Sequence, residues 1–188
     1  MALRSPMVLV PIAQGFEEIE AITIGDILIR AGNNLQYLSF SKDLLVQGSH
    51  GISLKCHSMA SEAPWGIADA VILPGGMPGA ANLCESEELL KQLNYFNQKG
   101  KLLGAICAAP MVFAKAGILT NRRVTCYPGF ESKLGHAKFV SDEDVVEDEN
   151  IITSRGPGTA MLFALALVKR LNDKSKAKVL SDALLFAN

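Results

Sequence analysis

The sequence has little net charge and no basic tract. Its 18 lysine and arginine residues nearly balance 19 aspartates and glutamates, which leaves a formal net charge of −1. Proteins that capture nucleic acid electrostatically carry clustered basic residues, commonly interleaved with aromatic ones. We therefore expect no nucleic-acid partner.

Metal-ligand spacing is also missing. The four cysteines, Cys56, Cys84, Cys107 and Cys126, are far apart and form no C-x-x-C pair, and the three histidines form neither H-E-x-x-H nor H-x-H. Those spacings are typical of zinc sites and redox pairs. The sequence thus predicts free thiols, histidines in exposed loops, no metal and no cofactor.

Long apolar runs are absent as well. No run reaches the ~18 residues that a membrane span needs. The run from Met7 to Ala13 is short, contains Pro11 and leads into acidic residues rather than into a small-residue cleavage site, so it does not resemble a signal peptide. We interpret it as a buried first strand, and expect a cytoplasmic protein without a membrane partner.

The chain is predicted to form one globular domain over residues 1–188. It is 49% hydrophobic and 20% charged, and has no linker, repeat or low-complexity segment. Short apolar runs alternate with amphipathic segments, which is typical of an α/β fold with a mostly parallel sheet covered by helices. Strands are predicted at Met7–Ile12, Leu35–Phe40, Ala70–Leu73, Leu102–Ile106, Val124–Cys126 and Ile151–Ser154. Helices are predicted at Glu18–Ala31, Glu87–Lys99, Ala108–Ala116, Thr159–Asn172 and Ser175–Phe186.

Two further segments are predicted to be hairpins. Residues 44–58 alternate around Gly48-Ser49-His50-Gly51, which favours an antiparallel hairpin attached to the sheet. The acid-rich segment 139–150 is interpreted as a solvated hairpin.

Cys107 is the candidate nucleophile, because it stands where a buried strand turns abruptly into a helix. A helix N-terminus favours a thiolate and lowers the pKa of a cysteine below its free value of ~8.5. The alternative is a small buried residue that fills a corner of the fold.

The ends of the other predicted strands supply residues that would support Cys107, since ligands of parallel sheets bind at the carboxyl ends of the strands. Gly75 and Gly76 leave backbone N–H groups unshielded, as an oxyanion hole requires, although a tight turn alone would explain them. Glu17, Glu18 and Glu20 lie in the first turn of a helix, where acids complement the dipole. A carboxyl beside a thiolate would have a raised pKa and could move a proton.

Four motifs, in this order and at these separations, resemble the ThiJ/PfpI superfamily and are closest to its deglycase branch. They are Gly-Phe-Glu-Glu-Ile-Glu, Leu-Pro-Gly-Gly, Ala-Ile-Cys-Ala-Ala-Pro and Thr-Ser-Arg-Gly-Pro-Gly-Thr, and the resemblance runs from Met7 to about Ala187. It implies a flavodoxin-like three-layer sandwich, a homodimer and an easily oxidised nucleophile at Cys107. It also implies a protonated Glu20 that contacts the sulfur, with the backbone of Gly75, Gly76 and Ala108 around it.

The activities that the resemblance implies are glutathione-independent conversion of methylglyoxal to lactate and removal of early glyoxal adducts from proteins or nucleotides. The substrates would be small aldehydes and dicarbonyls or glycated side chains. The alternative is a redox-sensing stress protein or chaperone in which Cys107 is oxidised to sulfinate. A glutaminase would need a His-x-Glu pair, which His136-Ala137-Lys138 does not supply.

The chain departs from the family pattern in two places. Tyr127 stands where some members have a histidine before the proline, so an imidazole base is absent there. His50 stands where an arginine occurs in the hairpin. Tyr127, Arg155 and Glu17 remain candidates for supporting roles, and for Arg155 a structural tie between loops is an equal alternative.

Overall fold

A computed structural model describes residues 4–186, so Ala187, up to which the family resemblance extends, lies outside the described residues. The centre is a seven-stranded sheet in the order β10-β11-β7-β6-β1-β2-β5. All neighbours in it are parallel except β10 and β11. The strands are β1 (Met7–Ile12), β2 (Asn34–Ser39), β5 (Ser58–Met59), β6 (Ala70–Leu73), β7 (Leu102–Ile106), β10 (Val145–Asp148) and β11 (Ile151–Ser154).

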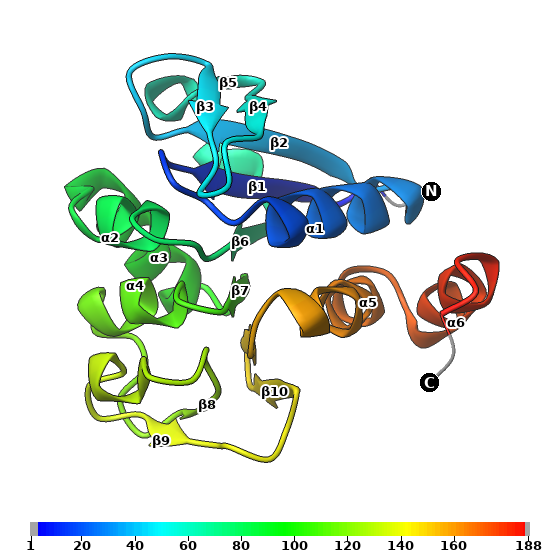
Figure 1. Ribbon diagram of the computed structural model, residues 1–188. Coiled ribbons are helices and arrows are strands. Elements are labelled where there is room, and N and C mark those ends of the chain that lie inside the picture. The colour runs from blue at the N-terminus through cyan, green and yellow to red at the C-terminus, as the bar shows by residue number, and fades with distance from the viewer. Residues whose placement is uncertain (1–3, 187–188) are drawn as a thin grey trace.

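Helices cover both faces of this sheet (Figure 1). On one side lie α1 (Glu18–Arg30) and α5 (Ala160–Leu171), which pack on each other, with α6 (Lys174–Ala183) outside α5. On the other side lie α2 (Gly79–Cys84), α3 (Glu87–Gln98) and α4 (Pro110–Lys115). The predicted flavodoxin-like three-layer α/β architecture is confirmed. Short 3-10 turns occupy Ala60–Glu62, Trp65–Ile67, Glu131–Lys133 and Pro157–Thr159.

The central strands are apolar because both of their faces are covered. Every residue of β6 and β7 is buried, as expected for parallel strands between two helical layers. No helix within residues 4–186 has the length and apolar character needed to cross a membrane.

The prediction that Val124–Cys126 forms a strand of the central sheet was wrong. A shorter strand, β8 (Arg123–Val124), pairs with β9 (Lys138–Phe139) in a separate two-stranded sheet. The reason is competition for the free edge of β11, because β10 occupies it. The backbone N–H of Thr125 instead donates to the side-chain hydroxyl of Thr153, at 2.9 Å.

The acid-rich segment 139–150 was predicted to be solvated, and this was wrong for its second half. Residues 145–148 form β10, the edge strand of the main sheet, and Val146 is completely buried. Several of its acids are paired with basic residues from other elements: Asp148 with Arg122, and Glu147 with Lys169 and Arg170. The apolar pair Val145-Val146 within the acidic run therefore marks a partly buried edge strand.

The predicted hairpin in residues 44–58 is present but stands apart from the main sheet. Strands β3 (Leu45–Gln47) and β4 (Ser53–Lys55) pair antiparallel in a sheet of their own. Figure 1 shows this hairpin with its turn directed toward the start of α1.

Substitution of Phe163 in α5 tests how much the helical layer contributes to the stability of the fold. Its ring is completely buried and lies over Gly104 of β7, where an added Cβ would come within 3.0 Å of it. Phe163→Ala should lower the free energy of unfolding by about 3–5 kcal/mol, since it leaves a cavity. Urea denaturation would measure this. Phe139→Ala, at a position 41% exposed, is the control and should cost about 0.5 kcal/mol; equal costs would contradict the packing described.

Candidate active site

Cys107 lies at the end of β7, in a left-handed backbone conformation with φ of 63°. Residues other than glycine adopt this conformation rarely, and when they do it is commonly at functional sites. Its N–H donates to the carbonyl of Ser154 at 3.0 Å, and its carbonyl accepts from the N–H of Tyr127 at 2.9 Å. The ends of β7, β11 and the segment after β8 are thereby joined at this cysteine, which is 8% exposed.

Gly75 allows the loop after β6 to approach the cysteine closely. A Cβ on this residue would lie 2.7 Å from Cβ of Cys107 and 2.9 Å from the backbone nitrogen of Ala108. Only glycine fits such an approach. Gly76 follows with φ of 90°, and a Cβ there would lie 2.4 Å from the backbone nitrogen of Glu17.

Glu20 is completely buried and points into the same region. Its Oε2 accepts a hydrogen bond of 2.7 Å from the N–H of Gly75. Its Oε1 has no hydrogen-bond partner among the described residues. The Cys107 thiol lies close to the carboxyl, and each of the two groups affects the pKa of the other. The predicted grouping of Cys107, Glu20, Gly75, Gly76 and Ala108 is therefore present in the structure.

Burial raises the pKa of Glu20 to about 7, and the nearby negative charge of Glu17 adds to this, while the Gly75 N–H and the Cys107 thiol oppose it. The carboxyl is thus protonated at acidic pH and loses its proton near neutrality, as expected for a carboxyl removed from water. A group with such a pKa can both donate and accept a proton at physiological pH.

The expected low pKa of Cys107 is not found. Burial, followed by the charge of Glu20 and the hydrogen bond with it, raises the pKa of Cys107 to about 12. The helix that was expected to lower it begins only at Pro110, three residues later. Backbone hydrogen bonds from Gly76 and Ala108 lower the pKa of the thiol. Protonation of Glu20 would remove its charge from beside the sulfur, while burial would still oppose a thiolate.

Glu17 is held next to this pair. It is the N-cap of α1, where its Oε2 accepts from the N–H of Glu20 at 2.7 Å, and its own N–H donates to the carbonyl of Gly75 at 2.9 Å. An N-cap of this kind stabilises a helix start by about 1 kcal/mol. Glu17 therefore joins the α1 start to the loop after β6.

Tyr127 and Arg155 lie together in a groove whose lining does not include Glu20 or Cys107. They line this groove of about 190 Å³ with Asp144, and the Arg155 guanidinium is 3.8 Å from the Asp144 carboxylate. Through its backbone, Tyr127 touches Cys107. The guanidinium of Arg155 faces Asp144 of the β10 segment, which favours the structural role that was left open for it.

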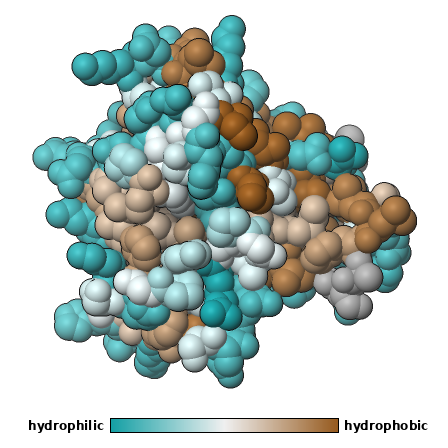
Figure 2. All heavy atoms as spheres, in the orientation of Figure 1, coloured by the Kyte–Doolittle hydropathy of each residue, from teal (hydrophilic) through white to brown (hydrophobic). Residues whose placement is uncertain are grey.

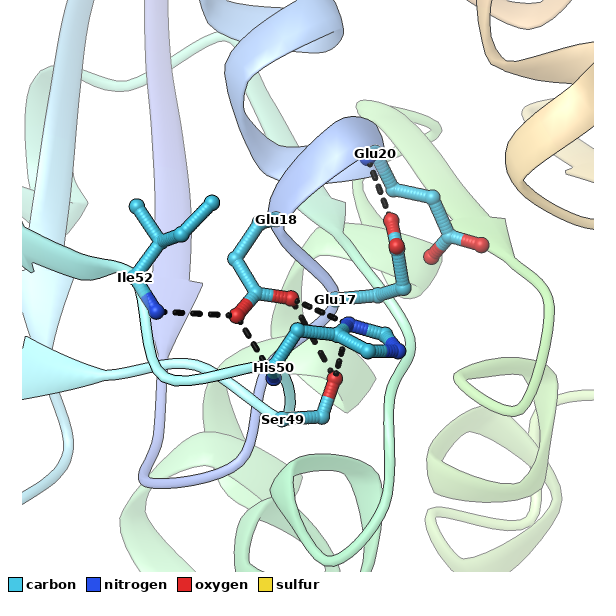
Figure 3. Close-up of polar contacts among 6 residues, drawn as sticks. All are labelled: Glu17, Glu18, Glu20, Ser49, His50 and Ile52. Atoms are coloured by element: carbon cyan, nitrogen blue, oxygen red, sulfur yellow. Dashed lines mark hydrogen bonds and ion pairs between the residues drawn. The ribbon is translucent and has the colours of Figure 1, made fainter.

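Sequence reasoning missed the contact between Glu18 and the β3–β4 turn (Figure 3). The Glu18 carboxylate accepts from the backbone N–H of His50 at 2.7 Å and lies 2.8 Å from Nδ1 of its ring. The presence of His50 and of three acids was visible in the sequence, but their proximity was not.

Among the described residues, one group of potential metal ligands lies close together. It consists of Glu17, Glu18 and His50, each with one ligand atom within 4.8 Å of those of the other two. Both oxygens of Glu18 already accept hydrogen bonds from the turn. Hydrogen bonding alone accounts for this cluster.

The fold and the site define a class: a flavodoxin-like α/β protein with a cysteine at the end of a central strand, paired with a buried glutamate. Residues 6–170 match the DJ-1/PfpI family. The chain belongs to the DJ-1/PfpI family.

Relatives agree with this assignment. Protein DJ-1 homolog B of Arabidopsis thaliana is 39% identical over 182 residues, 96% of this chain but 41% of the relative, so the chain spans less than half of that protein. Glutathione-independent glyoxalase DJR-1.2 of Caenorhabditis elegans is 35% identical over 188 residues, 99% of this chain and 98% of the relative. The crystal structure of Drosophila melanogaster DJ-1beta superposes with a TM-score of 0.95 at 35% identity, covering 98% of this chain and 100% of that one.

The raised pKa of Glu20 makes stability depend on pH. Between pH 4.5 and about 7 the folded protein holds a proton that the unfolded chain has released, so the free energy of unfolding falls as pH rises through this interval. The fall attributable to Glu20 should be of order 3 kcal/mol. Urea denaturation across this range should show that Glu20→Gln removes it, whereas Glu88→Gln on the exposed start of α3 keeps it. If the free energy of unfolding had the same pH dependence in wild type and Glu20→Gln, the raised pKa of Glu20 would be contradicted.

Proposed function

We propose that this protein is a cysteine-dependent enzyme that acts on reactive dicarbonyls. The reaction is glutathione-independent conversion of methylglyoxal to lactate, and the same chemistry extends to early glyoxal adducts on proteins or nucleotides. One observation carries the proposal: the thiol of Cys107 and the buried carboxyl of Glu20 lie close enough to shift each other's pKa, and the backbone of Gly75, which donates to Glu20, also closely approaches Cys107. The name of the Caenorhabditis elegans relative supports the same activity.

In the first step, the sulfur of Cys107 attacks the aldehyde carbon of methylglyoxal. A C–S bond forms, the aldehyde oxygen takes a proton, and the product is a hemithioacetal. The sulfur needs its negative charge for this attack, and hydrogen bonds from the N–H groups of Gly76 and Ala108 favour that charge.

In the second step, Glu20 moves a proton between adjacent carbons. Its carboxylate removes the hydrogen from the carbon bonded to sulfur and returns it to the neighbouring carbon. The hydroxyl proton of the hemithioacetal passes to the former ketone oxygen, which gives a thioester of lactate on Cys107. A pKa of about 7 suits a group that must take and give a proton in one cycle. Hydrolysis then releases lactate and the thiol, so methylglyoxal and one water give one lactic acid.

Lactate formed per protein, without glutathione, is the measurement that tests this activity. The wild type should complete many turnovers. Cys107→Ser should abolish them, since the nucleophile is lost. Glu20→Gln should slow them by about 10²–10⁴-fold, because the proton transfer loses its acid and base.

Cys84→Ser is the matched control for the cysteine variant, since Cys84 is also a free and buried thiol and should leave the rate unchanged. An inactive wild type would overturn the glyoxalase proposal. If Cys107 then gained two oxygens under mild peroxide, the redox-sensing alternative would be favoured.

We also propose that the protein forms a homodimer through α1. Three isoleucines of this helix, Ile19, Ile22 and Ile29, are 58%, 48% and 53% exposed. Figure 2 shows apolar atoms gathered over α1 and continuing toward α6. A contiguous apolar patch of this kind on a protein surface marks an interaction site, and a second copy of the same helix is complementary to it.

Ile22→Lys should disrupt this dimer, because it places a charge within the apolar face. Sedimentation at micromolar protein should give a dimer mass for the wild type and a monomer mass for the variant. Tyr95→Lys, at an exposed position of α3 on the opposite face of the sheet, is the control and should leave the mass unchanged. A monomeric wild type would contradict the proposal.

A further inference from the structure

The turn between β3 and β4 is fixed on the first turn of α1. The N–H of Gly15 donates to the carbonyl of Gln47 at 2.9 Å, and the N–H of Ser49 donates to the carbonyl of Phe16 at 2.8 Å. A Cβ on Gly48 would lie 2.4 Å from the carboxyl carbon of Glu18, so a side chain there would collide with it. Whatever the turn carries is therefore held at a defined place beside the α1 start.

The carboxylate of Glu18 is the centre of this contact (Figure 3). Its Oε1 accepts from the N–H of His50 at 2.7 Å and of Ile52 at 3.4 Å, and its Oε2 accepts from the hydroxyl of Ser49 at 3.3 Å. Although burial opposes ionisation, the hydrogen bonds from His50 lower the pKa of Glu18 to about 2. The group is therefore a carboxylate throughout the physiological range.

This carboxylate also fixes the orientation and tautomer of the His50 ring. Nδ1 lies 2.8 Å from Oε2 of Glu18, and a carboxylate oxygen only accepts, so Nδ1 carries the hydrogen. In the neutral ring, Nε2 then has a free lone pair. A histidine whose Nδ1–H is held by a buried carboxylate, with Nε2 free, has the arrangement of a general base.

His50 faces the side of α1 on which Glu17 and Glu20 lie. In Figure 3 its ring extends toward Glu17, whose carboxylate in turn approaches the backbone of Glu20. One ring nitrogen of His50 and one oxygen each of Glu17 and Glu18 lie within 4.8 Å of one another. Its side chain is 71% exposed in the protomer, so solvent water reaches it.

We propose that His50, oriented by Glu18, is the general base that activates water for hydrolysis of the acyl group on Cys107. This role rests on the proposed function, and it supplies the imidazole that Tyr127 does not provide. Glu18 is the positioning residue, and His50 is the catalytic one because it contacts the attacking water.

Nε2 of neutral His50 accepts a proton from water while the water oxygen bonds to the thioester carbonyl carbon. The C–S bond then breaks, Cys107 leaves as a thiolate, and it recovers a proton from the imidazolium. The products are a carboxylic acid, free thiol and neutral imidazole.

The step has a defined pH dependence. The groups that face His50 are Glu17 and Glu18 of α1 and Ser49 of the turn, and the hydrogen bond and charge of Glu18 raise the pKa of His50. Because the base must be neutral, hydrolysis slows as pH falls through that raised pKa. Because Glu20 also titrates near neutral pH, the part of the dependence that belongs to His50 is the part that a His50 variant with Glu20 intact removes.

The decisive experiment measures hydrolysis of an acyl group placed on Cys107 without methylglyoxal. Treatment with p-nitrophenyl acetate gives acetyl-Cys107, and the mass of the intact protein follows its decay. His50→Asn is the informative variant, since its amide nitrogen can replace Nδ1 as donor to Glu18 but cannot act as a base. We expect its hydrolysis to be slower by about 10²–10⁴-fold and to lose the acidic limb of the pH profile.

Two comparisons make the result unambiguous. His136→Asn, at another exposed histidine, should hydrolyse acetyl-Cys107 at the wild-type rate, and added imidazole should accelerate hydrolysis in His50→Ala. If His50→Asn hydrolyses as fast as wild type at every pH, His50 is not the base. This readout does not depend on lactate formation: an inactive wild type with methylglyoxal would overturn the glyoxalase proposal, while the acetyl-enzyme would still decide the role of His50.

Discussion

The rest of the site depends on the close approach of the Gly75 backbone to Cys107. The N–H of Gly75 donates to Glu20, its carbonyl accepts from Glu17, and its missing side chain leaves room for Cys107. A single residue thus ties β6 to β7 and to the start of α1. Any side chain at this position would have to push these three elements apart.

Burial is the second constraint, and it makes the chemistry of Glu20 and Cys107 depend on pH. Removing Glu20 from water raises its pKa to about 7, and its charge in turn raises the pKa of Cys107. The two groups therefore behave as one titrating unit. Protonation of the carboxyl removes its charge from beside the sulfur, while burial continues to oppose a thiolate.

The β3–β4 hairpin adds a different kind of group to the same region. Glu18 is next but one to Glu20, yet its carboxylate is directed toward the turn and is fully engaged there. The two acids consequently have opposite pKa shifts, one to about 2 and the other to about 7. Neighbouring carboxyls with such different environments can take different roles, one holding a charge and the other transferring a proton.

The sequence by itself determined the apolar strands of the parallel sheet, the position of Cys107 at a strand end and the family, because buried strands and short motifs leave strong local patterns. It also placed Glu20 and Gly75 near the cysteine through the family resemblance. Only the tertiary structure decided that β10, not residues 124–126, pairs with β11, since both segments compete for one edge. The pKa of Cys107 and the contact of His50 with Glu18 were likewise set by tertiary structure, because burial and the meeting of residues 32 positions apart have no local signal.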